Sequence, residues 1–315
     1  MIETLQSLRF VFVMMIFLSH FACRELQPFD AGGDCGVAFF FLLSGFVLSL
    51  GYGERIRQGQ FSYRAFLRKR LLRSYVPHWF CLAFFLVVSG ASADGKVLLN
   101  ALLLQSWIPD RDYYFSCNSV SWFLSSLLFC YAVFPLVFRH VSKRLTAVLL
   151  AAYVGACWLT PADRINAWLY VHPLARFVDF YLGMALYRYY EHHQEPLPSA
   201  WAEPLVVLLL MGALAVYPVA DAKLRNAPLY WLVLVPFILV FVRQQGVVSE
   251  WLRTRPMQWL GSLSMPLFLT HQMLIGILLR RLPSMPPVVM LAVCIFVVLM
   301  VSWGFQIIIS KVLRL

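Results

Sequence analysis

Long apolar runs recur along the whole chain, separated by short polar segments. Ten of them are long enough, or nearly so, to cross roughly 30 Å of hydrocarbon as helices. An eleventh run, residues 97–108, is too short to span and is predicted to be re-entrant or to lie at the membrane interface. The predicted spans cover residues 5–22, 37–52, 76–88, 120–138, 146–159, 174–190, 204–219, 230–242, 257–279 and 288–309.

The composition supports this pattern and excludes a water-soluble globule. Hydrophobic residues make up 61% of the chain and charged residues 13%, whereas soluble domains carry near 25% charged residues. No polar block or Pro/Ser-rich linker is large enough to mark a second unit. We therefore predict an all-α polytopic membrane protein in which residues 1–315 form a single membrane-embedded domain, without a fused soluble domain.

The charges between the predicted spans indicate the topology. Lys and Arg gather in cytoplasmic segments of membrane proteins, and with ten spans the basic segments fall on one face, which places both termini in the cytoplasm. The net charge of +11 is then a property of these segments and does not indicate nucleic-acid binding. We expect residues 54–73 to be a basic loop, with Pro77 near the first turn of the helix that follows. Arg280 and Arg281 fall on the outer face and fit this scheme poorly.

Seven cysteines are scattered through the chain, and none shows the spacing of a metal site, so no metal is expected. Cys23, Cys35 and Cys117 fall on or near the predicted outer face. A disulfide between two of them and three unpaired thiols are both compatible with the sequence.

The first span contains two ionisable residues, Arg9 and His20, eleven positions apart. At about 100° per residue the two side chains leave the helix within about 20° of the same direction, separated by roughly 16 Å along the axis. Ionisable residues inside a membrane usually face a cavity or a pathway. In the alternative interpretation, Arg9 extends to the inner headgroups and His20 only ends the helix.

Three further stretches hold polar residues that suit a binding site. Ser44 and Gly45 interrupt an aromatic run, either for close helix packing or to make room for a ligand. His271 lies in the middle of a predicted span, as a structural hydrogen-bonding group or as part of a cavity lining. The segment from residue 118 to 135 begins with Asn118 and Trp122, which we also assign to the cavity lining.

A basic cluster precedes the third predicted span and contains Arg68, Arg70 and Arg73. Several cations at a helix entrance suit a polyphosphate, although a cytoplasmic charge signal alone also explains them. No serine-hydrolase elbow, phosphate-binding loop or zinc signature is found in the sequence.

Five of these stretches, taken in their order along the chain, resemble the membrane acyltransferases of the acyltransferase-3 type, which O-acylate sugars of bacterial surface glycans. The resemblance covers nearly the whole chain. It departs from the family at residues 125–127, where many members have a glutamate, and at residues 265–266, where a tyrosine is usual. The matching stretches read "LQSLRFVFVMMIFLSHF", "GVAFFFLLSGFVLS", "RKRLLRSYVPHW", "NSVSWFLSSLLFCYAVFP" and "WLGSLSMPLFLTHQ".

The resemblance implies an acetyl-CoA-dependent O-acetyltransferase of the bacterial inner membrane, with His20 as the catalytic histidine and Arg9 as its partner. Cytosolic acyl-CoA is expected as the donor substrate, with its phosphates at Arg70, Arg73 and Arg68, and no permanently bound cofactor. The acceptor is expected to be a carbohydrate such as capsule, O-antigen or exopolysaccharide, and it is not identified by the sequence. His20 acts either as a base or as an acyl carrier. A non-catalytic transporter or flippase for a glycan or solute is the alternative function.

Overall fold

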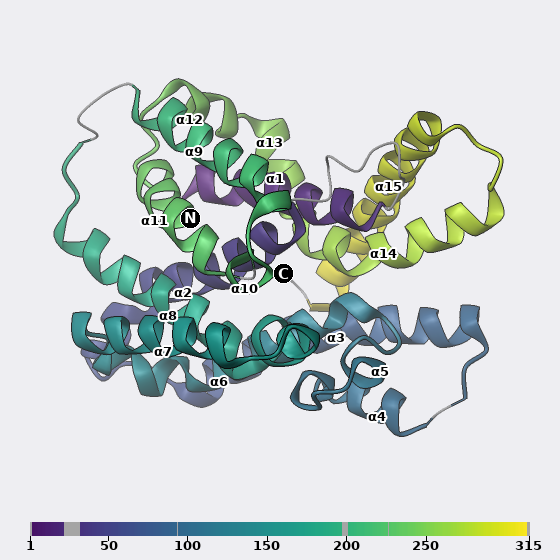
Figure 1. The fold of residues 1–315 in the computed structure, drawn as a ribbon, viewed down its shortest axis with the longest axis horizontal. Coiled ribbons are helices and arrows are strands. Elements are labelled where there is room, and N and C mark those ends of the chain that lie inside the picture. The colour runs from purple at the N-terminus through teal and green to yellow at the C-terminus, as the bar shows by residue number, and fades with distance from the viewer. Residues whose placement is uncertain (1, 22–31, 93, 197–200, 226, 314–315) are drawn as a thin grey trace.

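The computed structural model describes residues 2–21, 32–92, 94–196, 201–225 and 227–313, which form helices and turns without a strand among them (Figure 1). The all-α prediction is therefore confirmed for this part of the chain. Each of the ten predicted ranges coincides with a helix or helix pair. These are α1 (Glu3–His20), α2 (Gly33–Arg57), α3 (Tyr63–Ser89), α6 (Trp122–Val137), α7 (Lys143–Leu159), α8 (Pro173–His192), α9 (Ala202–Val216), α11 (Pro228–Phe241), α13 (Arg255–Ser262) with α14 (Ser264–Arg281), and α15 (Pro287–Leu313).

Six helices in the described ranges are long and apolar enough to cross a membrane, and a seventh is obtained if the bent pair α13 and α14 forms one span. The axes of that pair meet at 59°, so the predicted continuous helix over residues 257–279 is wrong at this point. Helix α7 has only 17 residues, and α1 and α8 carry charged residues. Ten spans with cytoplasmic termini therefore stay a prediction.

The eleventh apolar run holds two short helical elements, α4 (Gly95–Ala101) and η2 (Gln105–Trp107). A buried polar network fixes them. The Gln105 amide donates to the Ser121 hydroxyl (3.0 Å), which donates to Asn100 Oδ1 (3.1 Å). These bonds hold the segment against the start of α6 without a span of its own, although Gln105 Oε1 is buried and has no partner in the structure.

Helix α3 begins before the basic cluster, which corrects the prediction of a basic loop over residues 54–73. Helix α2 continues to Arg57 and α3 starts at Tyr63, so the connection is only five residues long. Pro77 consequently lies inside α3 and not near its first turn. A proline has no N–H to donate to the carbonyl four residues earlier, which here belongs to Arg73.

Helices α2 and α8 cross at two glycines. A β-carbon on Gly45 would collide with the backbone oxygen of Phe180, and one on Gly183 would collide with that of Leu42. Since only hydrogen occupies these positions, the two backbones can approach directly. The packing interpretation of the residue 44–45 pair is therefore confirmed for Gly45.

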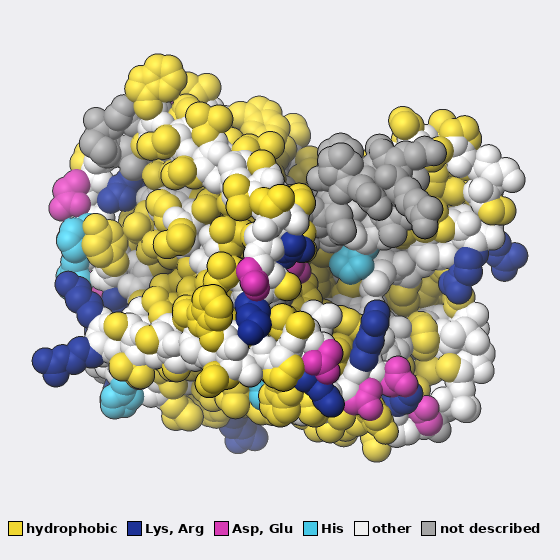
Figure 2. Space-filling model, in the orientation of Figure 1, with side chains coloured by type: hydrophobic (Ala, Val, Ile, Leu, Met, Phe, Trp, Pro, Cys, Tyr) yellow, Lys and Arg dark blue, Asp and Glu magenta, His cyan; other side chains and the backbone are white. Residues whose placement is uncertain are grey.

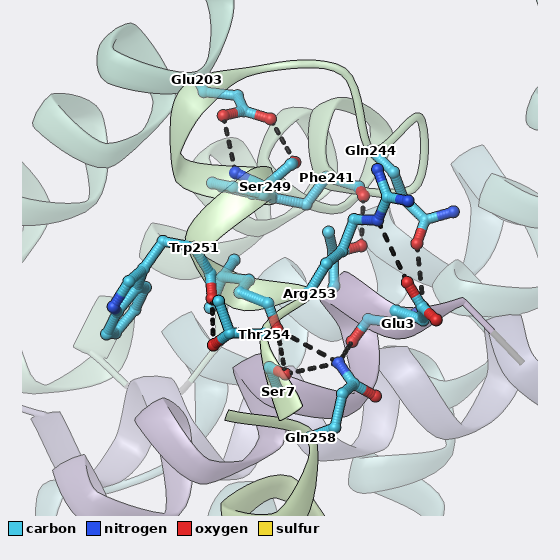
Figure 3. Close-up of polar contacts among 12 residues, drawn as sticks. Glu3, Ser7, Glu203, Phe241, Gln244, Ser249, Trp251, Arg253, Thr254 and Gln258 are labelled. Carbon is cyan, nitrogen blue, oxygen red and sulfur yellow. Dashed lines mark hydrogen bonds and ion pairs between the residues drawn. The ribbon is translucent and has the colours of Figure 1, made fainter. Parts of the chain in front are cut away.

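Helix α1 runs through the middle of the molecule, and its first turns are fastened to the segment around α12 (Val247–Leu252) and α13 (Figures 1 and 3). Thr4 donates to the Phe241 carbonyl and Ser7 to the Leu252 carbonyl, each at 2.5 Å. The Gln258 amide donates to the Ser7 hydroxyl at 2.7 Å. These bonds set the position of the helix that carries both Arg9 and His20.

A buried carboxylate on α9 also fixes the start of α12. Buried Glu203 accepts a bond from the backbone N–H of Gly246 at 2.9 Å, just before α12. It also accepts bonds from the backbone N–H (3.0 Å) and the hydroxyl of Ser249, as Figure 3 shows. An acidic group at a helix N-terminus accepts hydrogen bonds from the unpaired backbone N–H groups of the first turn and interacts favourably with the helix dipole. Helix α12 is therefore held against α9.

A buried ion pair joins α8 to its neighbours. Arg176 Nη1 lies 2.8 Å from Asp179 Oδ2, and both side chains are fully buried. Trp231 on α11 donates its indole N–H to Asp179 Oδ1 at 2.5 Å, and Arg176 donates to the Leu169 carbonyl at 2.7 Å. The opposite charges of Arg176 and Asp179 are thus paired inside the bundle.

Candidate functional site

Three arginines face one hollow, which we call the arginine cavity. Its volume is about 350 Å³, within the range of small-molecule sites of about 300–1,000 Å³. Arg9 of α1 and Arg70 and Arg73 of α3 line it, together with residues of α2, α6, α14 and α15. Ile2 and Leu313, at the two ends of the described chain, also line it, so this cavity lies at the face predicted to be cytoplasmic.

Aromatic side chains position Arg70 without neutralising it. Its guanidinium carbon lies 5.5 Å from the ring centres of Tyr52 and Phe66 and 5.6 Å from that of Tyr131. The Nε atoms of Arg70 and Arg73 are buried and have no hydrogen-bond partner in the structure. Among the described residues, no carboxylate pairs with either arginine or with Arg9. Unpaired guanidinium groups in one hollow favour a ligand with several negative charges.

Arg9 occupies the α1 side of this cavity. Its Nη1 donates to Gln6 Oε1, one helical turn earlier, at 3.4 Å. Ser44, on α2, donates its hydroxyl to the Phe40 carbonyl and also lines the cavity. Ser44 therefore faces the arginine cavity, whereas its neighbour Gly45 lies in the close contact between α2 and α8.

Tyr131 of α6 lines the same cavity and was not singled out by the sequence analysis. Its side chain interacts with Ser44 and lies near both Arg9 and Arg70. The residue lies within the fourth matching stretch, so the only sequence signal was its polarity inside an apolar run. Its position links α6 to the two helices that carry the arginines.

His20 contacts His271. Nδ1 of His20 lies 3.3 Å from Nε2 of His271 and 2.8 Å from the Ile16 carbonyl oxygen. The ring centres are 5.0 Å apart, with the rings near perpendicular. Two of the predicted residues, from opposite ends of the sequence, are thus in direct contact.

Backbone carbonyls fix the tautomers of the two rings. Nδ1 of His271 lies 2.8 Å from the Phe268 oxygen and 3.1 Å from the Leu267 oxygen. A carbonyl can only accept, so each neutral ring carries its proton on Nδ1. The single Nδ1 proton of His20 is then shared between the Ile16 carbonyl oxygen and, at the longer distance, the Nε2 lone pair of His271. This arrangement leaves the lone pair of His20 on its own Nε2, the atom that can act as a base or a nucleophile.

A second hollow, of about 610 Å³, lies at the other ends of α3 and α14, and we call it the Asn118 cavity. Asn118 is fully buried and donates its amide to the Leu269 carbonyl at 2.9 Å. Its Oδ1 is buried and has no partner in the structure. The Ser119 hydroxyl donates to Gln272 Oε1 beside it. An orphaned acceptor in a hollow suits a ligand that brings a hydroxyl group.

The histidine pair lies between the two cavities along the helices that line both. On α14, Phe268 lines the arginine cavity and Gln272 lines the Asn118 cavity, and His271 lies between them. On α3, Pro77 lines the first cavity and Phe84 the second. One turn of helix separates Phe268 from His271, a rise of roughly 4.5 Å. Along α14 the histidine pair therefore lies at a level between the two cavities, and neither ring lines either of them.

Four predicted residues line neither cavity. His20 and His271 contact each other outside both linings, so the prediction that His271 lines a cavity is wrong, because its ring is fully buried. Arg68 is exposed on α3 and lines neither cavity. Trp122 is buried, with its ring centre 4.9 Å from that of Tyr170 and its carbonyl bonded to Ser106 at 2.9 Å, and it also lines neither cavity.

The structure describes two of the three cysteines that were predicted on or near the outer face. Cys35 and Cys117 are not bonded to each other, and Cys23 lies outside the described residues. Among the residues that the structure places, no group of three or more His, Cys, Asp or Glu side chains could hold a metal ion.

The two departures from the family pattern have local explanations. Ser126 donates to the Val171 carbonyl at 2.6 Å, and Ser125 accepts a long bond from the Ser106 N–H at 3.4 Å, so both hydroxyls are used inside the bundle. Met265 and Pro266 line the arginine cavity. The residues that replace the usual tyrosine therefore still contribute to the site.

Comparisons with known proteins found one family and one curated relative. The model of a family described as "Acyltransferase domain" matches residues 2–307. A curated relative, the acyltransferase MdmB of Streptomyces mycarofaciens, is 27% identical over 322 aligned positions that cover 87% of this chain and 79% of that protein. No solved structure matches.

Proposed function

The chain belongs to the acyltransferase-3 family of membrane acyltransferases, and on that basis we propose that it moves an acyl group, acetyl in the family's common case, from cytosolic acyl-CoA to a hydroxyl of a surface carbohydrate. The acceptor hydroxyl belongs, in this proposal, to a glycan such as capsule, O-antigen or exopolysaccharide. The observation that carries this proposal is the histidine pair between two cavities at opposite ends of the same helices.

The proposed setting is the bacterial inner membrane, crossed ten times with both termini in the cytoplasm. Ten helices or helix pairs at the predicted positions support this topology. The arginine cavity then opens near the termini, on the side where acyl-CoA is available. The Asn118 cavity opens on the side where a surface glycan is assembled.

Acyl-CoA is proposed to bind in the arginine cavity. Arg70 and Arg73 carry unpaired buried Nε atoms and suit the CoA phosphates. Arg9 supports the donor from α1, at roughly 16 Å from His20 along the axis. Since the cavity lining extends to Phe268, one turn from His271, an extended pantetheine arm can carry the thioester from the arginines toward the histidines.

The chemical step follows from the tautomers. His20 Nε2 removes the proton of the acceptor hydroxyl as its oxygen attacks the thioester carbonyl carbon. The carbon–sulfur bond breaks, and the departing CoA sulfur takes the proton from the His20 imidazolium, which regenerates the neutral ring. His271 Nε2 and the Ile16 carbonyl accept from Nδ1 throughout and stabilise the transient positive charge. In the second form of the mechanism, His20 Nε2 attacks the thioester carbonyl carbon and CoA leaves as the thiolate. The acceptor hydroxyl then attacks the acyl group on His20, the carbon–nitrogen bond breaks to restore the neutral ring, and the hydroxyl proton passes to the CoA thiolate.

Purified protein in lipid nanodiscs, supplied with radiolabelled acetyl-CoA and surface glycan from a strain that lacks this gene, tests the function. We expect the label to appear on the glycan with wild type and not with His20→Ala. Rapid mixing with acetyl-CoA in the absence of glycan separates the two forms of the mechanism, because only the acyl-carrier form releases a burst of about one CoA per protein before an acceptor is present. Normal transfer by a well-folded His20→Ala variant would refute the role of His20.

The same assay distinguishes the proposed acyltransferase from a transporter or flippase. A transporter or flippase would use Arg9 and His20 to line a pathway and would release no CoA from acetyl-CoA. The family assignment favours the transferase.

A further inference from the structure

Two arginines line the Asn118 cavity on the face where the predicted topology does not expect cations. Arg280 and Arg281 end α14 and line this hollow together with Asn118, Ser119 and Gln272. Basic residues near span ends usually mark the cytoplasmic side, and these two fall on the other. Figure 2 shows Lys and Arg side chains at the right-hand edge, where Figure 1 places the end of α14.

Neither arginine is neutralised by a carboxylate that the structure describes. Arg280 donates its Nε to the Gly276 carbonyl at 2.9 Å, which uses one of five N–H groups of its guanidinium. Arg281 is exposed. A favourable interaction with the C-terminal end of the helix dipole explains one cation at this position. The helix dipole does not explain why Arg280 and Arg281 both line a hollow that is also lined by Asn118, whose Oδ1 has no hydrogen-bond partner in the structure.

The remaining lining has the character of a ligand site. The buried Oδ1 of Asn118 lacks a hydrogen-bond donor, and a ligand hydroxyl supplies one. Apolar groups of Phe84, Phe85 and Met273 form another part of the wall. Gln272 and Arg280 are eight residues apart on α14, a rise of roughly 12 Å. A hydroxyl near Asn118 and an anionic group near the arginines would thus be separated by about the length of a short saccharide.

We infer that the Asn118 cavity binds an acceptor that carries a negatively charged group, either a phosphate or a carboxylate, with that group at Arg280 and Arg281 and its sugar hydroxyls toward Asn118. The inference rests on the proposed function, since it takes the ligand of this cavity to be the acyl acceptor. It also gives the two outer arginines a role that the topology alone leaves unexplained.

Cys117 is a native reporter for this cavity. It lines the hollow and is partly exposed, whereas the other described cysteines are buried. Burial, and to a lesser extent the Asp94 carboxylate, raise the pKa of the Cys117 thiol above its ordinary value. Alkylation requires the thiolate, so the reaction with N-ethylmaleimide is run at pH 8 and followed on the Cys117 peptide by mass spectrometry.

The probes are two pairs of sugars that differ in charge. Chitobiose 1-phosphate is compared with chitobiose, and cellobiuronic acid with cellobiose, because a disaccharide is long enough to reach from the arginines toward Asn118. We expect the anionic member of at least one pair to protect Cys117 at a concentration about tenfold lower than its neutral partner. Protection by the phosphate pair alone identifies a phosphate, and protection by the acid pair alone identifies a carboxylate. Equal protection by charged and neutral sugars, or protection by none, would overturn the inference.

Variants assign the effect to the arginines. In Arg280→Gln/Arg281→Gln the tenfold preference is expected to disappear, and in Arg280→Lys/Arg281→Lys most of it is expected to remain because the charge is kept. Arg164→Gln is the matched control, since Arg164 is exposed on the same predicted face and lines neither cavity. A preference that persists in the double glutamine variant would also overturn the inference.

The outcome is separable from the proposed function. If wild type transfers label from acetyl-CoA but anionic sugars have no advantage, the function stands and the anion site fails. If anionic sugars protect Cys117 but no acyl transfer occurs with any glycan, the anion site stands and the acceptor assignment fails.

Discussion

Nε2 of His271 lies 3.3 Å from Nδ1 of His20, although 251 residues separate them in the chain. The contact resembles the arrangement in which a third group orients a catalytic base. In the proposed mechanism His271 acts through His20, which makes it a positioning residue.

We predict that His271→Phe lowers kcat by up to about 10²-fold, because a base displaced by about 1 Å loses that much. The KM for acetyl-CoA is expected to stay unchanged, since His271 does not line the arginine cavity. His271→Gln is expected to recover part of the rate because its amide oxygen can accept from His20. Steady-state kinetics with both substrates check this. His140→Asn, an exposed histidine, serves as the control, and a parallel rise in both KM values would contradict the positioning role.

Arg70 and Arg73 provide the second prediction. Arg70→Gln and Arg73→Gln are each expected to raise the KM for acetyl-CoA about tenfold, because a charged hydrogen bond to phosphate contributes roughly 1.5–3 kcal/mol. Arg68→Gln is the matched control on the same helix, since Arg68 is exposed and lines neither cavity. Donor binding can be measured directly with desulfo-CoA by calorimetry. If Arg68→Gln weakens binding as much as the other two, the cluster acts only through its general positive charge.

The α2–α8 crossing provides the third prediction. Gly45→Ala and Gly183→Ala are each expected to lower the melting temperature and the yield of folded protein strongly, because each added methyl group meets a backbone oxygen that cannot move aside. Gly51→Ala, also in α2, is the control. No heavy atom lies within 4 Å of its β-carbon position, and alanine favours helix over glycine. Equal stability of all three variants in detergent would show that the two helices can separate without loss of the fold.

The helices themselves could be predicted from the sequence because length and hydropathy are properties of a continuous segment. The bend between α13 and α14 and the α2–α8 crossing depend on partners distant in the chain, and one-dimensional patterns do not contain them. The start of α3 was missed for a related reason. Its first turns carry arginines and resemble a loop in hydropathy, but they are helical.

The candidate site could be predicted in part. Arg9, Arg70 and Arg73 share one cavity, as their assignment to the same donor suggested, whereas the contact between His20 and His271 was not predicted. The orphaned oxygen of Asn118 and the position of Tyr131 depend on which helices become neighbours. Neither can be read from residue spacing along a single helix.

The buried pair of Arg176 and Asp179 provides the fourth prediction. Asp179→Ala leaves a guanidinium uncompensated in the bundle, which typically costs about 3–5 kcal/mol. It also removes the acceptor of the Trp231 indole N–H. We expect a large fall in melting temperature and in the fraction of protein that is monodisperse in detergent.

The exposed pair of Asp163 and Arg164, with an N···O distance of 3.5 Å, offers the matched control. Asp163→Ala is expected to change the unfolding free energy by less than about 1 kcal/mol because water solvates both partners. Arg176→Met/Asp179→Leu is expected to be more stable than Asp179→Ala alone, since it removes both charges together. If the double variant is the less stable of the two, the hydrogen bond from Arg176 to the Leu169 carbonyl, and not the ion pair, holds α8 in place.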